Sequence, residues 1–306
     1  MVVILGPTAV GKSRLSIELA ERMGGEIISA DSRLLYRQMD IGTDKPSPEE
    51  RARVPHHLIN VADPDQVWSL ALYQRAAYRA IREISGCGRL PFLVGGTGQY
   101  IHAVVEGWEI PEVKPDLRLR RSLNQWAHQI GAEALHARLR TLDPLSADRI
   151  DYRNVRRTVR AMEVIFTTGR RFSAQRQRGP VQFQALLLGL TRPREELYAR
   201  IDQRIEAMIE GGLIAEVERL LDQGFSPELP TLSAIGYGEI TAYLAGAIPL
   251  EEAIMQIKRR TRAFVRRQAN WFKLDDPDIA WFRIGPGVLA ELETAIQGWL
   301  ERKATI

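Results

Sequence analysis

The chain contains several short apolar runs, each bounded by glycine, proline or polar residues. The first is Val2–Leu5, and comparable runs occupy residues 26–30, 90–94, 183–190 and 279–284. A strand buried on both faces is apolar at nearly every position, which is typical of a parallel sheet. Segments with apolar residues at helical spacing separate these runs. This alternation predicts an α/β fold built on a parallel sheet.

The first run leads into the sequence GPTAVGKS and then into a segment with helical spacing. It matches the pattern G-x-x-x-x-G-K-[ST], placed between a strand and a helix as a phosphate-binding loop requires. Glycines let successive backbone N–H groups point at one phosphate, and the helix N-terminus adds partial positive charge. We therefore predict that a di- or triphosphate binds at Gly6, Pro7, Thr8, Ala9, Val10, Gly11, Lys12 and Ser13.

Two side chains of this loop have specific chemistry. Lys12 is expected to reach the outer phosphate, and Ser13 offers a hydroxyl to Mg²⁺, the metal that such sites usually hold. The loop does not specify which phosphate compound binds or what is done to it.

Composition and charge exclude some classes of protein. The 306 residues carry a net charge of only +4, so the distribution of charge must indicate any polyanionic partner. The single cysteine, Cys87, excludes an internal disulfide framework and a zinc site built from cysteines. The apolar run at Val2–Leu5 leaves no room for a signal peptide, and no apolar run is long enough for a bilayer. We expect a cytoplasmic monomer without a membrane partner.

Asp31 follows the second apolar run directly. Strand ends in a parallel sheet meet ligands at the same edge as the phosphate loop, so this carboxylate is expected to face the site. A helix cap or a group that orients Mg²⁺ is an equally good interpretation from the residues alone. Residues 33–48 have no clean period and predict a long loop, which often indicates function.

The composition changes near residue 113. Residues 113–182 lack buried strands and have helical spacing, so we predict a helical domain inserted into an α/β core made of residues 1–112 and 183–306. Between Arg149 and Arg178 it carries nine arginines but only Asp151 and Glu163 as acids. Arginine forms bidentate phosphate contacts, which favours a nucleic-acid surface over an ordinary solvated face. These arginines are Arg149, Arg153, Arg156, Arg157, Arg160, Arg170, Arg171, Arg176 and Arg178.

Two further helices carry notable charge. Arg200 and Arg204 lie four residues apart, so they share one helix face and are predicted to contact phosphate. A helix predicted over residues 250–273 has seven basic residues, no acid after Glu252, and three interleaved aromatics. That mixture suits single-stranded nucleic acid, although the aromatic rings could equally face the core.

With these motifs assembled, the chain resembles the tRNA dimethylallyltransferases of the bacterial type. The resemblance runs through nearly the whole chain, and several long motifs occur in the right order. Gln99 departs from the family pattern, in which leucine is commoner at that position. The motifs are GPTAVGKS from Gly6, DSRLLYRQMDIGTDKP from Asp31, PHHLI from Pro55, VGGTGQY from Val94, VRRTVRAMEV from Val155, AIGYGE from Ala234 and RRQANWFK from Arg266.

The resemblance implies a core related to nucleotide kinases and transfer of a dimethylallyl group from dimethylallyl diphosphate. The acceptor is the exocyclic N6 of the adenosine 3′-adjacent to the anticodon, so the partner is a tRNA anticodon stem-loop. Catalytic roles fall on Lys12, Asp31 and Thr97, with Asp31 as the proton acceptor. The implied tRNA contacts are Asp31, Ser32, Arg33, Leu34, Thr97, Arg118, Arg156, Arg157, Thr158, Val159, Arg160, Arg266, Arg267, Gln268, Trp271 and Lys273.

Two other functions share some of these features. A small-molecule kinase would use the same loop, sheet and arginine pair, but it gives no role to the basic segment 250–273. An RNA-binding module with an inactive loop is a third possibility, and the intact Lys12, Ser13 and Asp31 argue against it.

Overall fold

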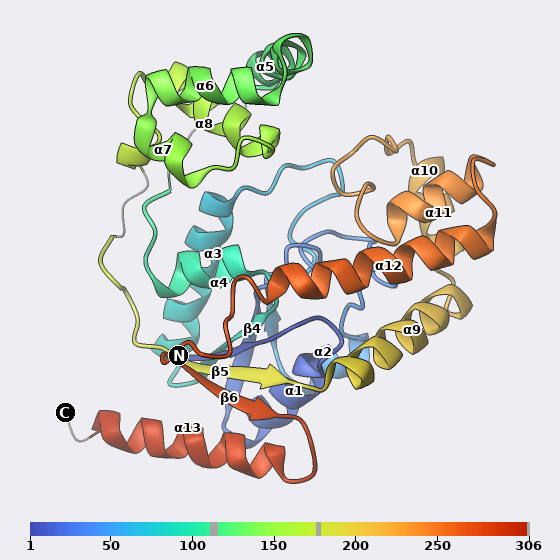
Figure 1. Ribbon diagram of the computed structural model, residues 1–306. Coiled ribbons are helices and arrows are strands. Elements are labelled where there is room, and N and C mark those ends of the chain that lie inside the picture. The colour runs from blue at the N-terminus through green and yellow to red at the C-terminus, as the bar shows by residue number, and fades with distance from the viewer. Residues whose placement is uncertain (111–115, 176–178, 305–306) are drawn as a thin grey trace. The chain divides into compact units, whose positions relative to one another are not determined.

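The computed structural model describes residues 1–110, 116–175 and 179–304. Within these residues six parallel strands form one sheet, in the order β3-β2-β4-β1-β5-β6 (Figure 1). The prediction of an α/β fold with a parallel sheet is confirmed. The strands are β1 (Val2–Leu5), β2 (Gly25–Ser29), β3 (His56–His57), β4 (Leu90–Gly95), β5 (Leu186–Thr191) and β6 (Ile279–Arg283).

The central strand β1 explains why the first apolar run is continuous. All four of its residues are fully buried, because the strand has neighbours on both edges and helices over both faces. Val3 lies between Leu93 of β4 and Leu187 of β5 in the parallel register. The loop after β1 therefore leaves from the middle of the sheet's carboxyl edge.

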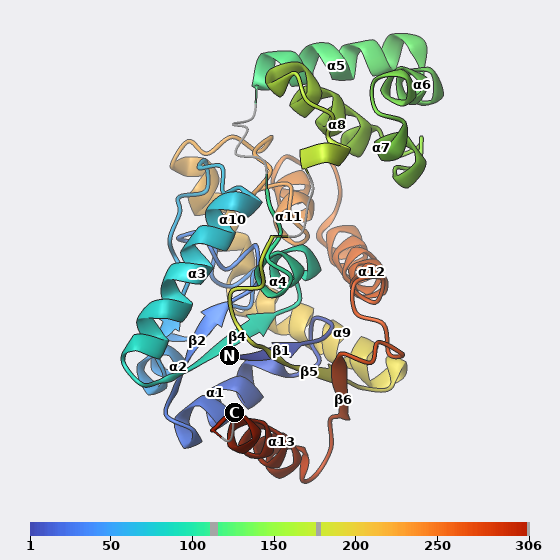
Figure 2. The same ribbon diagram turned by 90° about the vertical axis from the view of Figure 1, so that its left-hand side faces the viewer.

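Helices cover both faces of the sheet. Right-handed crossovers place α1 (Lys12–Arg22) and α3 (Leu70–Gly86) on opposite faces, because the strand order moves in opposite directions after them. The last helix, α13 (Val288–Ala304), contacts α1, β5 and β6, and both views show it beneath those strands (Figures 1 and 2).

Six more helices lie in the described residues of the part of the chain that contains the sheet. The helix α12 ends at Gln268 and not at residue 273 as predicted from its composition. Beyond it the chain turns, with the Trp271 N–H donating to the Gln268 carbonyl, and the Phe272 side chain is buried in the core. The six helices are α2 (Pro48–Arg53), α4 (Gly98–Val105), α9 (Arg194–Glu210), α10 (Leu213–Asp222), α11 (Tyr237–Leu244) and α12 (Leu250–Gln268).

The chain divides into two compact units. Unit 1 comprises Met1–Val105 and Phe183–Ile306, and unit 2 comprises Glu106–Gln182. The first boundary predicted from the sequence, residue 113, lies outside the described residues, as do Arg176 and Arg178. Unit 2 contains α5 (Leu117–Ile130), α6 (Ala132–Leu142), α7 (Pro144–Arg149), α8 (Val155–Thr168) and the short 3₁₀ helix Ser173–Gln175.

Unit 2 has a hydrophobic core of its own. Leu135 and Leu139 of α6 pack with Met162 of α8, and all three are fully buried. In the described ranges of both units, no helix combines the length and apolar character needed to cross a membrane.

Candidate active site

The phosphate loop connects β1 to α1 and depends on two glycines with positive φ. Gly6 has φ 146°, and a Cβ there would lie 2.6 Å from the Leu190 carbonyl oxygen of the neighbouring strand β5. Gly11 has φ 111° and precedes the first turn of α1. Lys12 curls back over the loop, and its Nζ donates to the carbonyls of Gly6 at 3.0 Å and Pro7 at 2.8 Å. The Lys12 side chain therefore lies across the loop and stabilises its conformation.

The electrostatic setting of Lys12 is unusual. Burial is the main reason that the pKa of Lys12 is lowered to about 8, and Arg204 lowers it further, while Asp31 and Asp44 oppose the shift. A buried ammonium group that is only partly compensated gains from an added anion. The loop is therefore suited to a phosphate group.

Three arginines from the segment after β5 surround the loop. Burial, followed by the charges of its two arginine neighbours, lowers the pKa of Arg200. Arg192 was not predicted as a site residue. Its position just after a strand of the parallel sheet could have identified it, because ligands bind at that edge of the sheet. The contacts are Arg192 Nε to the Val10 carbonyl at 2.9 Å, Arg200 Nε to the Ala9 carbonyl at 2.9 Å, and Arg204 Nη2 to Thr8 Oγ1 at 3.1 Å.

A cavity of about 410 Å³ opens beside this loop, entirely within unit 1. It brings together predicted residues from the phosphate loop, the end of β2 and α9, and it adds Asp44, which the sequence analysis did not select. The polar lining includes Lys12, Ser13, Asp31, Asp44, Arg200 and Arg204.

Asp31 stands at the carboxyl end of β2, half-buried on the cavity wall. Its Oδ1 accepts the Arg33 N–H at 2.9 Å, which makes an Asx turn. Residues 30–47 contain no helix, so a helix-capping role for Asp31 is not observed. The side chain is held by its own turn and remains next to the phosphate loop.

Thr97 lies close to Asp31 because hydrogen bonds connect the residues that follow β2 with those that follow β4. The Thr97 N–H donates to the Ala30 carbonyl at 3.2 Å, and Thr97 Oγ1 accepts the Ser32 N–H at 3.2 Å. Leu34 lines the cavity, and Arg33 Nη1 donates to the Pro230 carbonyl at 3.3 Å. The predicted group Asp31, Ser32, Arg33, Leu34 and Thr97 thus forms one cluster at the sheet edge.

Gln268, predicted as an RNA contact, points into the protein. Its Oε1 accepts the Thr8 N–H at 2.9 Å, and its Nε2 donates to the Gly96 carbonyl at 2.9 Å. The side chain is buried and connects the phosphate loop to the second glycine turn. Trp271 also faces inward, since a Cβ on Gly98 would lie 2.2 Å from its ring. Gln268 therefore stabilises the phosphate loop from inside the protein, and the Trp271 ring packs on Gly98 of α4.

The basic helix α12 is less positive than its sequence suggests. Three of its cations pair with acids of other helices, which a pattern along one helix does not reveal. Among the described residues, neither Arg266 nor Arg267 pairs with a carboxylate: Arg266 donates to the Tyr198 hydroxyl at 3.4 Å, and Arg267 lies over the Phe264 ring. The three ion pairs are Lys258 with Glu206, Arg260 with Glu239, and Arg262 with Asp202.

The arginines of unit 2 also differ from one another. Arg156 and Arg157 are exposed in the first turn of α8, whereas the Thr158 and Val159 side chains are buried in the core of the unit. Arg160 is half-buried and pairs with the fully buried Glu163 at 2.7 Å. Glu163 also binds Arg120 at 2.9 Å, and it accepts the Asp116 N–H. Arg118 lies exposed in the first turn of α5.

The donors around the cavity fit a magnesium ion better than a transition metal. The described residues contain no group of three or more His, Cys, Asp and Glu side chains placed to hold a metal. The cavity offers the Ser13 hydroxyl and the carboxylates of Asp31 and Asp44. Mg²⁺ prefers oxygen ligands and usually keeps several waters beside one or two carboxylates and a substrate phosphate.

Comparison with known proteins identifies the family. The family model described as "IPP transferase" matches residues 34–275, and the model described as "Isopentenyl transferase" matches residues 1–57. The chain belongs to the IPP transferase family. The resemblance to tRNA dimethylallyltransferases that the sequence motifs indicated is therefore confirmed.

Relatives of this IPP transferase span nearly the same length. A tRNA dimethylallyltransferase of Roseiflexus sp. (strain RS-1) is 52% identical over 273 residues, which cover 89% of this chain and 90% of that protein. The tRNA dimethylallyltransferase of Thermomicrobium roseum is 48% identical over 305 residues, covering 99% of this chain and 92% of the relative.

Solved structures agree. The tRNA isopentenylpyrophosphate transferase of Bacillus halodurans has a TM-score of 0.74 at 40% identity, covering 99% of this chain and 97% of that one. A eukaryotic dimethylallyltransferase acting on tRNA has a TM-score of 0.76 at 28% identity, covering 98% and 77% respectively. The predicted fold class, a phosphate-loop core with an inserted helical domain, is confirmed.

Proposed function

We propose that this IPP transferase moves the dimethylallyl group of dimethylallyl diphosphate to N6 of the adenosine 3′-adjacent to the anticodon of tRNA. One observation carries the proposal. A phosphate loop contacted by arginines shares a cavity with the carboxylate of Asp31, so a diphosphate leaving group bound at the loop would lie beside a proton acceptor. Membership of the IPP transferase family, whose relatives are named tRNA dimethylallyltransferases, indicates the two substrates, a dimethylallyl donor and tRNA.

The cationic side of the cavity would bind the donor diphosphate. Lys12 and the loop amides stabilise the negative charge that grows on the leaving group as its bond to the allylic carbon breaks, whereas Arg200 and Arg204 bind the diphosphate equally before and during that step. The Ser13 hydroxyl would hold Mg²⁺, which would supply further neutralisation of the charge on the leaving group.

The acidic side of the cavity would act on the acceptor. An adenine amino nitrogen is a weak nucleophile, and positive charge develops on it as the new C–N bond forms. Asp31 accepts the N6 proton, and the neighbouring Thr97 hydroxyl helps to position the base. A base inside a helical stack cannot reach the donor carbon, so the target adenosine must leave its stack.

The exposed cations would bind the RNA backbone. Arg118, Arg156 and Arg157 of unit 2 and Arg266 and Arg267 of α12 remain open to solvent. Lys273 is also exposed, just after α12. Thr158, Val159 and Gln268 are omitted from this set because their side chains are buried. We further propose that the chain acts as a monomer, since unit 1 alone supplies the cavity; sedimentation at working concentration tests this.

A kinase reaction is the competing function, and omission of ATP separates the two. Purified protein with Mg²⁺, dimethylallyl diphosphate and unmodified tRNA should release inorganic diphosphate without ATP. A transcript with guanosine in place of the target adenosine should release none. An absolute requirement for ATP, with phosphate appearing on a small acceptor, would overturn the proposal.

A further inference from the structure

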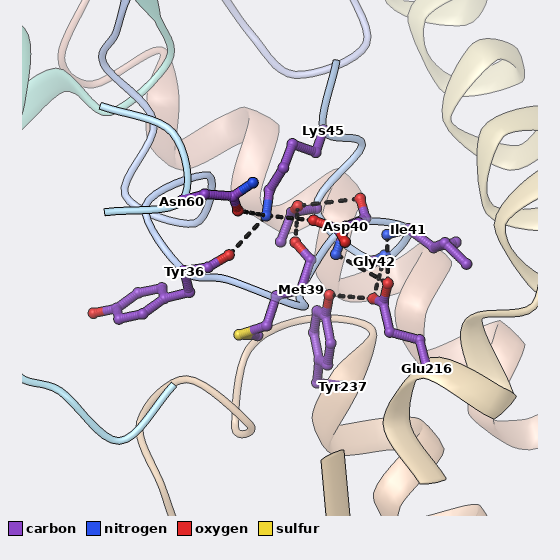
Figure 3. Close-up of polar contacts among 10 residues, drawn as sticks. Tyr36, Met39, Asp40, Ile41, Gly42, Lys45, Asn60, Glu216 and Tyr237 are labelled. Carbon is purple, nitrogen blue, oxygen red and sulfur yellow. Dashed lines mark hydrogen bonds and ion pairs between the residues drawn. The ribbon is translucent and has the colours of Figure 1, made fainter. Parts of the chain in front are cut away.

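The segment 40–45 is an irregular loop that borders the donor cavity and has no regular secondary structure to fix it. Asp44, the residue that faces Arg204, has φ 56°, a left-handed conformation that aspartate adopts more readily than most non-glycine residues. Figure 3 shows the groups that hold the neighbouring residues of the segment.

Glu216 of α10 holds one side of the loop. Its Oε2 accepts the N–H groups of Asp40 at 2.9 Å and Ile41 at 2.8 Å, and its Oε1 accepts the N–H of Gly42 at 3.1 Å (Figure 3). The Tyr237 hydroxyl donates to the same Oε1 at 2.6 Å. Three successive amides thus enclose one buried carboxylate, in the arrangement by which a backbone nest binds an anion.

Lys45 closes the other side of the loop. Its Nζ donates to the Tyr36 carbonyl at 2.7 Å, to Asp40 Oδ1 at 2.6 Å and to Asn60 Oδ1 at 2.7 Å (Figure 3). The Lys45 N–H also donates to the Asp40 carbonyl at 3.0 Å. All three ammonium protons are used, so this lysine is committed to the loop and is not free to bind a ligand.

The fixed loop ends at the phosphate site. Asp44 Oδ2 accepts from Arg204 Nη1 at 3.0 Å, and the other terminal nitrogen of Arg204 donates to Thr8 Oγ1 at 3.1 Å. Arg204 therefore stands between the segment 40–45 and the phosphate loop. Its orientation depends on where Asp44 is placed, and Glu216 determines the position of the backbone just before Asp44.

We propose that Glu216 is a positioning residue for the donor diphosphate: by binding the amides of residues 40–42 it places Asp44, which orients Arg204 toward the phosphate loop. This inference rests on the proposed function, because it assigns Arg204 to the donor. Within the described residues, the hydrogen bonds of Glu216 go to the amides of residues 40–42 and to Tyr237, none of which lines the cavity. Its influence on the reaction passes through Asp44 and Arg204.

The variant Glu216→Gln tests the proposal. An amide nitrogen cannot accept the N–H groups that one carboxylate oxygen now binds, so the loop must shift. We expect KM for dimethylallyl diphosphate to rise about tenfold, the size of a lost charge-assisted hydrogen bond, with kcat and tRNA affinity nearly unchanged. Should Glu216→Gln fail to fold, Glu216→Asp keeps the charge at shorter reach and is judged by the same KM change.

A matched control is Asp143→Asn. Like Glu216, Asp143 is a buried carboxylate that accepts backbone N–H groups, here those of Ser146 and Ser173, and it belongs to unit 2 and not to segment 40–45 or its partners. It should lower the melting temperature without raising KM for the donor. A general loss of stability is thereby separated from positioning.

A double-mutant cycle with Asp44→Ala tests whether Glu216 acts through Asp44. If Glu216 acts through Asp44, adding Glu216→Gln to Asp44→Ala leaves the donor KM where Asp44→Ala alone puts it. Additive increases, or a Glu216→Gln variant with normal donor KM, would overturn the inference. Binding of inorganic diphosphate to the unmutated chain is measured in parallel, and its absence would contradict the proposed function instead.

Discussion

At the scale of single residues, the site combines a buried cation and a carboxylate in one cavity. Lys12 lies deep in the phosphate loop, where burial lowers its pKa to about 8. Asp31 stays on the cavity wall because its side chain closes a turn at the end of β2. Its value for catalysis comes from this position beside the phosphate loop.

The substitution Asp31→Asn tests that position. Asparagine keeps the size of the side chain and still accepts a hydrogen bond, but it cannot take a proton. Turnover should fall roughly 10²-fold or more, as for loss of a general base, while donor affinity and melting temperature stay close to normal. Asp63→Asn, an exposed change on the following loop, is the control. Near-normal kcat for Asp31→Asn would exclude the general-base role.

The lowered pKa of Lys12 gives a pH dependence with a definite sign. Below pH 8 Lys12 carries its positive charge and attracts the diphosphate, and as the pH rises through about 8 the charge is lost. The value of kcat/KM for the donor should therefore decline through that range. The Lys12→Arg side chain stays charged at these pH values. In this variant kcat/KM for the donor should therefore not decline over that range, whatever the absolute activity. An equal decline in both proteins would assign the titration to another group.

At the scale of elements, helices with similar basic sequences differ in how much charge remains free. On α12, Lys258, Arg260 and Arg262 are neutralised by acids of α9 and α11. On α8, Glu163 binds Arg160, while Arg156 and Arg157 stay exposed. The strands and the phosphate loop could be predicted because their patterns are local. These ion pairs could not, because each joins residues that only the tertiary fold brings together.

Salt dependence distinguishes free cations from paired ones. Replacing both Arg156 and Arg157 by alanine should weaken tRNA binding and reduce the slope of log K against log salt by about one unit per lost phosphate contact. Lys258→Ala removes a cation already paired with Glu206, so it should leave the slope almost unchanged. Equal effects of the two changes would indicate general electrostatics without defined phosphate contacts.

At the scale of the whole molecule, long-range contacts explain what the sequence did not reveal about the site. Long motifs identified the family, and the change of composition near residue 113 predicted the helical insert. The loop motif, the strand end and the arginine pair predicted several of the residues that line the cavity. Arg192, Asp44 and Glu216 escaped notice because their roles depend on partners far along the chain: Glu216 and the Asp40 amide are 176 residues apart. The family motif predicted Gln268 as an RNA contact. In the structure its side-chain amide instead accepts the Thr8 N–H and donates to the Gly96 carbonyl, inside the protein.

Mass analysis of nucleosides tests the central claim most directly. Unmodified tRNA is incubated with the protein, Mg²⁺ and dimethylallyl diphosphate in the absence of ATP, then digested and analysed by position. We predict one adenosine heavier by a dimethylallyl group in each reactive tRNA, located 3′-adjacent to the anticodon. An unmodified adenosine at that position in tRNA that the protein demonstrably binds would contradict prenyl transfer by this cavity.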